Sequence, residues 1–112
     1  MRNLPAALIA PALLLIAARS AAAGDAAAPA QVQIVDFMRF DPPSLSVPAG
    51  TTVTWVNHDG SNHIIQFRDA KSPRLRHDAR YSRRFDSPGE YHYVCAIHGE
   101  RMSGTIVVTA PP

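Results

Sequence analysis

Residues 48–57 read PAGTTVTWVN, a sharp turn followed by a run of β-branched residues that contains the only tryptophan, Trp55. Proline and glycine in 48–50 favour a turn, because proline fixes one backbone torsion and glycine tolerates conformations closed to other residues. Thr51–Val56 has the composition of a half-buried strand. This turn-then-strand pattern recurs on both sides of the stretch and indicates the fold class.

Six further segments alternate apolar and polar residues or are rich in β-branched and aromatic residues, and proline or glycine turns separate several of them. They are 32–37, 45–47, 63–67, 81–85, 91–95 and 104–109. Residues 68–80 show no clean period and leave room for a short helix. The pattern predicts an all-β chain, an antiparallel Greek-key β-sandwich or barrel of about seven to eight strands.

The first residues have the features of a secretory signal peptide. Arg2 gives a positive start, residues 4–18 are almost wholly apolar, and small residues stand at 21–24. This apolar run is shorter than the roughly 20 residues that span a bilayer, which favours cleavage over a membrane anchor. We therefore expect cleavage after Ala23 and export to the periplasm.

This reading divides the chain into a signal peptide over 1–23, a flexible lead-in over 24–31 and one domain over 32–110. Removal of the signal peptide also removes Arg2 and Arg19, so that the 11 basic residues fall to 9 and balance the 9 acidic ones. A near-neutral domain gives no support to nucleic-acid binding.

The remaining charge is uneven, because basic residues crowd one stretch with few acidic residues among them. The basic residues are Arg68, Lys71, Arg74, Arg76, Arg80, Arg83 and Arg84, and the acidic ones are Asp69 and Asp78. Two interpretations stay open, a solvated loop face and a docking surface for an acidic partner.

Cys95 is the only cysteine, so an exported form of this chain has no internal disulfide. Small secreted domains usually need a stabiliser beyond their hydrophobic core, and a metal ion is one such stabiliser. Burial or metal ligation also protects a lone thiol from oxidation. Cys95 is therefore a candidate metal ligand.

Cys95, His98 and Met102 follow one another on a single predicted loop between two strands, and His63 begins another strand. Two imidazoles, one thiolate and a weak thioether suit copper in electron transfer, because this set lies between the preferences of Cu(I) and Cu(II). Zinc more often takes a closed set of cysteine and histidine ligands. The pattern therefore predicts one copper ion per chain.

Four sequence features together resemble the cupredoxins, in particular the branch of plastocyanin, amicyanin and pseudoazurin. These are PAGTTVTWVN at 48–57, His63, PGEYHYVCAIH at 88–98 and MSGTIVV at 102–108. Their order and spacing are similar to the family's over nearly all of residues 32–109. The resemblance implies a cupredoxin fold and a small blue copper protein.

The resemblance also implies the copper ligands, His63, Cys95, His98 and Met102. Three residues, 99–101, separate His98 from Met102, whereas amicyanin-like loops have two there and plastocyanin-like loops have four. The Met-x-Gly pattern of the family is present and favours Met102 as the axial ligand. This intermediate loop length affects the distance from Met102 to the copper ion, and through that distance the colour and the redox potential of the site.

The neighbours of the first histidine depart from the family pattern. Many members carry asparagine directly after it, tying the two ligand loops together, whereas Ile64 follows His63 here and Asn62 precedes it. Because hydrogen bonds around the ligands tune such sites, this departure implies a looser or differently poised site.

The other three histidines have separate interpretations. His92 faces away from Cys95 by strand alternation and is a surface or core residue. His58 lies in the loop before His63 and is open to a role in a less enclosed copper site. His77, in the basic stretch, is interpreted as solvated.

The predicted function is a monomeric periplasmic one-electron carrier that cycles between Cu(II) and Cu(I). The sequence contains no recognisable enzyme motif, and the resemblance implies that His98 lies near the surface and passes the electron to redox partners in weak, transient encounters. Two alternatives stay open: a periplasmic copper-binding or delivery protein with the same ligands, and a small structural sandwich with a vestigial site.

Overall fold

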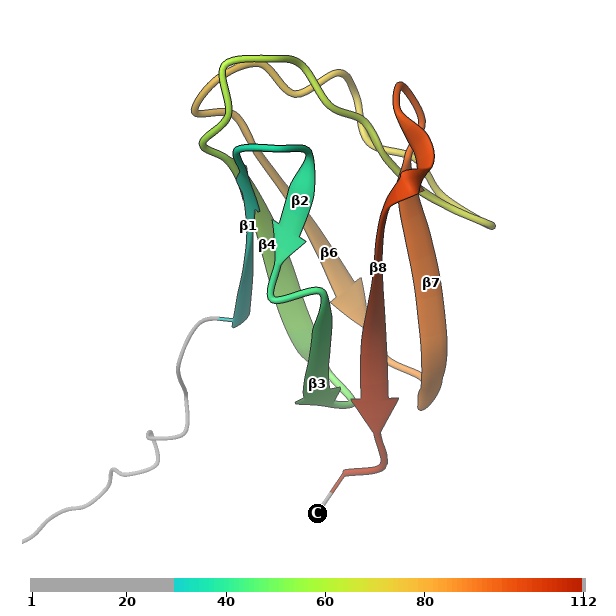
Figure 1. The fold of residues 1–112 in the computed structure, drawn as a ribbon. Helices are drawn as coiled ribbons and strands as arrows, with labels where there is room; N and C mark the ends of the chain where they lie inside the picture. The colour runs from blue at the N-terminus through green and yellow to red at the C-terminus, as the bar shows by residue number, and fades with distance from the viewer. Residues whose placement is uncertain (1–29, 112) are drawn as a thin grey trace, which may run out of the picture.

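The computed structural model describes residues 30–111, which form eight strands (Figure 1). The predicted signal peptide and nearly all of the predicted lead-in lie outside the described residues. The strands are β1 Ala30–Val35, β2 Arg39–Asp41, β3 Ser44–Pro48, β4 Thr51–Asn57, β5 Ile65–Phe67, β6 Arg80–Phe85, β7 Gly89–Cys95 and β8 Gly99–Thr109.

The strands make two four-stranded sheets that pack face to face, in the orders β2-β1-β4-β6 and β3-β8-β7-β5. The prediction of an all-β sandwich of seven to eight strands is confirmed. The sheets are mixed, however, because β1 runs parallel to β4 and β3 runs parallel to β8. The ends of β1, β4 and β7 and the starts of β6 and β8 lie at one end of the sandwich, and the loops gathered there carry the candidate site (Figure 1).

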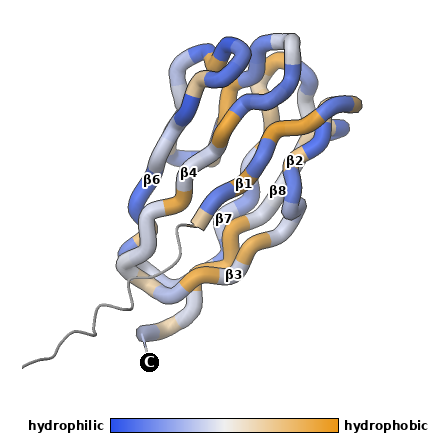
Figure 2. Tube along the Cα trace, turned by 90° about the vertical axis from the view of Figure 1, so that its left-hand side faces the viewer, coloured by the Kyte–Doolittle hydropathy of each residue, from blue (hydrophilic) through white to orange (hydrophobic). Residues whose placement is uncertain are grey.

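The core forms because alternate residues of each strand point between the sheets. Figure 2 shows hydrophobic and hydrophilic positions alternating along the strands. Trp55 of β4 is fully buried and its ring contacts Phe67, Phe85 and Tyr93 at centroid distances of 5.7, 6.4 and 5.4 Å. Strand β4, the most clearly predicted strand, therefore also supplies the central residue of the core.

The structure departs from the predictions in three further places. The last strand, β8, begins at Gly99 rather than at residue 104, so Met102 lies in a strand and not on the predicted loop. The first strand does not extend to Phe37, which is 85% exposed in a turn with a φ of 68°. The turn reverses the chain into the short strand β2, which the sequence did not indicate. Residues 68–79 contain no helix and pair through isolated bridges. Within residues 30–111, no helix is long and apolar enough to cross a membrane.

Candidate metal centre

The loop between β4 and β5 is organised by Asn57, the last residue of β4, which is fully buried. Its side-chain amide donates hydrogen bonds to the carbonyl oxygens of Ser61 and Leu75, at 2.9 and 3.0 Å. Its side-chain oxygen accepts one from the backbone N–H of Asp59 at 2.8 Å. Because a buried amide is costly to leave unpaired, these three bonds fix the path of the chain toward His63.

His63 is fully buried and is held by the carboxylate of Asp59. Its Nε2–H donates to Oδ2 of Asp59 at 2.9 Å, and Ser61 Oγ donates to the same oxygen at 2.5 Å. The hydrogen bond from Ser61 and that from His63 hold the pKa of Asp59 at about 2. With Nε2 protonated toward a carboxylate, Nδ1 keeps its lone pair for a metal.

The turn between β7 and β8 presents Cys95 and His98. Cys95 is the last residue of β7 and pairs with Gly99, the first residue of β8, around a three-residue turn. Gly99 has a φ of 75°, a conformation that favours glycine and closes the turn. The thiol of Cys95 is fully buried, whereas His98 is only half-buried.

The two ligand regions converge on one point. Nδ1 of His63 lies 3.7 Å from Sγ of Cys95, and Nδ1 of His98 lies 3.4 Å from it. The three potential ligand atoms all lie within 4.8 Å of one another. Metal bonds of about 2.0 Å to nitrogen and 2.3 Å to sulfur that meet at 120° place the nitrogen and the sulfur about 3.7 Å apart, close to the two nitrogen–sulfur distances here. The residues therefore fit a trigonal metal site.

Met102 is 1% exposed and occupies the first inward-facing position of β8. Two residues later, Gly104 packs against Tyr93, and a Cβ at Gly104 would collide with the Tyr93 hydroxyl. Burial raises the pKa of Tyr93 to about 12. The Met-x-Gly pattern thus combines a buried thioether with space for an aromatic ring beneath Cys95.

A backbone hydrogen bond joins the two ligand regions directly. The N–H of Ala96 donates to the carbonyl of Ile64 at 2.9 Å. The side chain of Asn57 provides a further brace for the first loop. The sequence indicated a looser or differently poised site because Ile64 stands where many members carry asparagine. In the structure the main chain connects the two loops at this position.

The other histidines lie outside the group formed by His63, Cys95 and His98. His58 is exposed, and its ring contacts the side chain of Gln33. His92 is exposed on the outer face of β7, with its Nε2 3.6 Å from Glu100, as strand alternation predicted. His77 is exposed beside Asp78.

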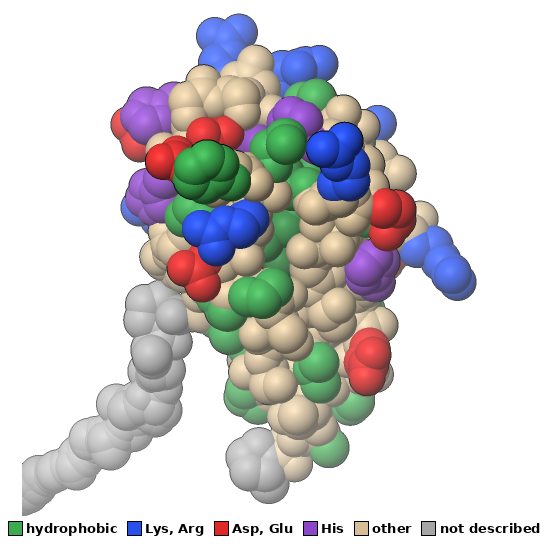
Figure 3. All heavy atoms as spheres, viewed as in Figure 1, with side chains coloured by type: hydrophobic (Ala, Val, Ile, Leu, Met, Phe, Trp, Pro, Cys, Tyr) green, Lys and Arg blue, Asp and Glu red, His purple; other side chains and the backbone are tan. Residues whose placement is uncertain are grey.

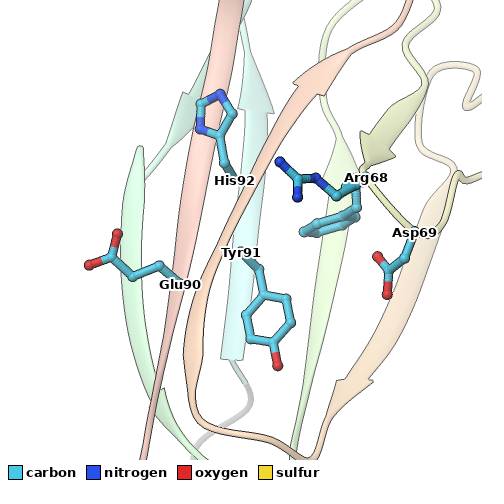
Figure 4. Close-up of a pocket in the computed structure, with 6 residues that line it drawn as sticks. Arg68, Asp69, Glu90, Tyr91 and His92 are labelled. Atoms are coloured by element: carbon cyan, nitrogen blue, oxygen red, sulfur yellow. The ribbon is translucent and has the colours of Figure 1, made fainter.

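A pocket lined by residues 67–69 and 90–92 contains no candidate metal ligand. Figure 4 shows the basic groups of Arg68 and His92 and the carboxylates of Asp69 and Glu90 on its walls. Charges of both signs line it, and Asp69 already accepts two hydrogen bonds from Arg83 at 3.0 and 3.1 Å. The chemistry of the molecule therefore centres on the buried thiol and its two histidines.

Comparison with known proteins identifies this arrangement. A family model described as a cupredoxin-like domain matches residues 6–108. The chain belongs to the cupredoxin family. It shares that family with amicyanin and plastocyanin, and its described residues include one candidate copper site, formed by His63, Cys95 and His98.

The cupredoxin is similar to amicyanin-alpha of Methylorubrum extorquens, with 36% identity over 78 residues that cover 63% of this chain and 65% of that protein. It is similar to plastocyanin of Scenedesmus fuscus, with 40% identity over 83 residues covering 62% of this chain and 85% of that one. Amicyanin and plastocyanin are electron carriers rather than enzymes, in agreement with the prediction of a non-enzymatic protein.

Among solved structures, this cupredoxin matches a novel purple cupredoxin from Nitrosopumilus maritimus. The TM-score is 0.66 at 32% sequence identity, and the match covers 71% of this chain and 99% of that one.

Proposed function

We propose that this cupredoxin is a one-electron carrier whose copper ion is held by His63, Cys95 and His98, with Met102 as the axial ligand. The observation that carries the proposal is the convergence of Nδ1 of both histidines on the buried Cys95 thiol, at 3.7 and 3.4 Å. When bound, copper supplies the Cu(II)/Cu(I) couple.

The protein frame supports repeated electron exchange because it positions the ligands in advance. Asp59 fixes the ring of His63, and the bond from Ala96 to Ile64 fixes the turn that carries Cys95. A ligand set whose geometry lies between the preferences of Cu(II) and Cu(I) needs little rearrangement when the copper ion gains or loses an electron. Rigid ligands therefore favour a carrier.

The exposure of the two histidines supports an electron route through His98. His63 is completely buried, whereas His98 reaches the surface beside Ile97, which is 41% exposed. Phe37, the other large exposed hydrophobic side chain among the described residues, lies in the turn at the same end of the sandwich. These apolar groups suit a weak, transient encounter with a redox partner.

The proposed location is the periplasm. The support comes from the features of residues 1–23, namely a positive start, an apolar stretch and small residues before the expected cleavage site. The lone thiol of Cys95, buried in the structure, is compatible with an oxidising compartment.

Copper titration followed by optical spectroscopy and voltammetry tests the carrier function. We expect one equivalent of copper, an intense visible absorption, complete bleaching by ascorbate and full recovery with ferricyanide. A colourless protein that holds only Cu(I) would instead indicate copper delivery. A protein that binds no stoichiometric copper would contradict both functions and leave a vestigial site.

A further inference from the structure

The connection between β5 and β6 folds back along the outer edge of β5 and reaches the metal end. Leu75 and His63 exchange two backbone hydrogen bonds, at 2.7 and 3.1 Å. Farther along, the N–H of Ser72 donates to the carbonyl of Ile65 at 2.9 Å, and Lys71 forms a bridge with Gln66. Residues 71–76 therefore act as an additional edge segment whose path is fixed beside a candidate ligand.

This segment presents three exposed cations, Lys71, Arg74 and Arg76, which we name the basic edge. Leu75 is 2% exposed and anchors the segment in the core, while Arg74 and Arg76 on either side of it are exposed. The ion pairs among the described residues involve none of the three. Their charges are thus available to a partner.

Other charges of the basic stretch have structural roles. Arg83 is 17% exposed, binds both carboxylate oxygens of Asp69, and stacks over the rings of Phe67 and Phe85 at 4.6 and 4.7 Å. Asp69 is thereby neutralised. The remaining acidic residue of the stretch, Asp78, lies beside His77 with its carboxylate 3.5 Å away. Neither carboxylate forms an ion pair with a cation of the basic edge.

The basic edge adjoins the site through the backbone. Leu75 pairs with His63, and Nδ1 of His63 faces Cys95. Figure 3 shows Lys and Arg side chains projecting at the end of the molecule where the β5–β6 connection crosses in Figure 1. An anionic surface drawn to this edge would approach the end that also exposes His98.

We propose that the basic edge docks an acidic patch of a redox protein and thereby selects acidic partners over basic ones. This inference rests on the carrier function proposed above and adds the charge of its partner. Complementary charges mainly raise the association rate and align the encounter. Apolar contact at Phe37 and Ile97 then brings the partner to His98, so the charges and the contact surface have separate roles.

Stopped-flow electron transfer with two haem proteins of opposite charge tests the proposal. The probes are the soluble domain of cytochrome b5, which is acidic, and cytochrome c, which is basic. Each ferrous haem gives one electron to the copper protein, Fe(II) becoming Fe(III) as Cu(II) becomes Cu(I). At low ionic strength we expect cytochrome b5 to react about tenfold or more faster with the native chain than with the double variant Arg74→Glu/Arg76→Glu.

The matched control uses the same charge reversal at the opposite end of the sandwich. Arg84 pairs across the sheet with Thr52, far along β6 from the metal end, and is 63% exposed. Arg76→Glu should slow the reaction with cytochrome b5 several-fold more than Arg84→Glu, and 0.5 M salt, a concentration with a Debye length of only about 4 Å, should abolish the difference. Equal rates for the two single variants, or a native rate that rises with salt, would overturn the proposal.

Docking is also measured without electron transfer. Addition of cytochrome b5 to the isotope-labelled Cu(I) form should shift the amide resonances of residues 71, 72, 74–76 and 97–99, and the double variant should lose these shifts. Shifts confined to other surfaces, or binding to anionic phospholipid vesicles with none to cytochrome b5, would refute the acidic-protein partner. Failure of ascorbate to reduce the copper would refute the carrier function separately.

Discussion

The two ligand-bearing regions of this cupredoxin differ in how they hold their histidines. In the loop over 57–63, Asn57 bonds the backbone of the loop and the carboxylate of Asp59 accepts a hydrogen bond from His63, whose ring is fully buried. The turn after β7 is short, partly exposed, and leaves His98 at the surface. One region therefore provides rigidity and the other provides access.

The difference follows from the length and composition of the two regions. In the loop over 57–63, several polar side chains form hydrogen bonds within the loop. Leu75, far along the chain, bonds to both Asn57 and His63 and holds the two ends of the loop. The second has small or apolar residues and depends on a positive-φ glycine and one bond to Ile64. Because rigidity and exposure are supplied by separate segments, substitutions should affect them separately.

The largest expected effect comes from removing either histidine. His63→Gly and His98→Gly should each weaken copper binding by more than about 100-fold, since even substitutions outside the ligand set cost 10–100-fold. Added imidazole should restore colour in His98→Gly, where the position opens to solvent, and fail in His63→Gly, where the ring is 0% exposed. Optical titration measures both, and equal rescue would contradict the comparison.

Next in size is the loss of the brace in the first loop. Asn57→Ala removes three hydrogen bonds of a buried amide and leaves the carbonyl of Leu75 without that partner. The free energy of unfolding should fall by about 2–3 kcal/mol, measured by urea denaturation of the copper-free protein. Asn62→Ala, in the same loop, serves as the control and should cost less than about 0.5 kcal/mol. Similar decreases in the free energy of unfolding for both variants would contradict the role of Asn57 in holding this loop.

A smaller effect is expected beneath the second region. Met102→Leu keeps the volume of the buried side chain but removes the axial donor. Because a lower coordination number favours Cu(I) over Cu(II), this substitution should raise the reduction potential. A rise of about 60–120 mV corresponds to one or two factors of ten in the one-electron equilibrium. Voltammetry measures it, with Met38→Leu as the control. An unchanged potential would exclude Met102 as the axial ligand.

The smallest effect concerns the carboxylate behind His63. Asp59→Asn retains a hydrogen-bond acceptor for Nε2 but removes a negative charge that favours Cu(II) over Cu(I). The reduction potential should rise by about 30–60 mV, which corresponds to a change of up to about tenfold in the one-electron equilibrium constant. Asp78→Asn, an exposed carboxylate, should change it far less. A fall in potential would mean that lost hydrogen bonding outweighs the charge.

Local signals made much of this structure predictable. The alternation of β4 and the spacing of Cys95, His98 and Met102 depend on neighbours in the sequence, and the structure places Cys95 and His98 together with Nδ1 3.4 Å from Sγ. The inclusion of His63 followed from the resemblance to the cupredoxins. Strand alternation also predicted the outward position of His92.

Features that depend on distant contacts were not predictable. The role of Asn57 requires the carbonyl of Leu75, 18 residues away, and residues 68–79 pair by single bridges that leave no regular period. The expected strand at Phe37 was wrong because alternation alone does not reveal a turn of positive φ. Asp59, four residues before His63, had a local signal, but only the loop path shows that its carboxylate reaches the ring.

Optical and copper analysis of the native chain beside Cys95→Ser tests the central claim most directly. The claim is that the thiolate of Cys95, between His63 and His98, holds the copper. The native protein should bind one equivalent and show an intense thiolate-to-copper absorption, and Cys95→Ser should lose that absorption and most of its copper affinity. Retention of both colour and affinity in Cys95→Ser would contradict the account.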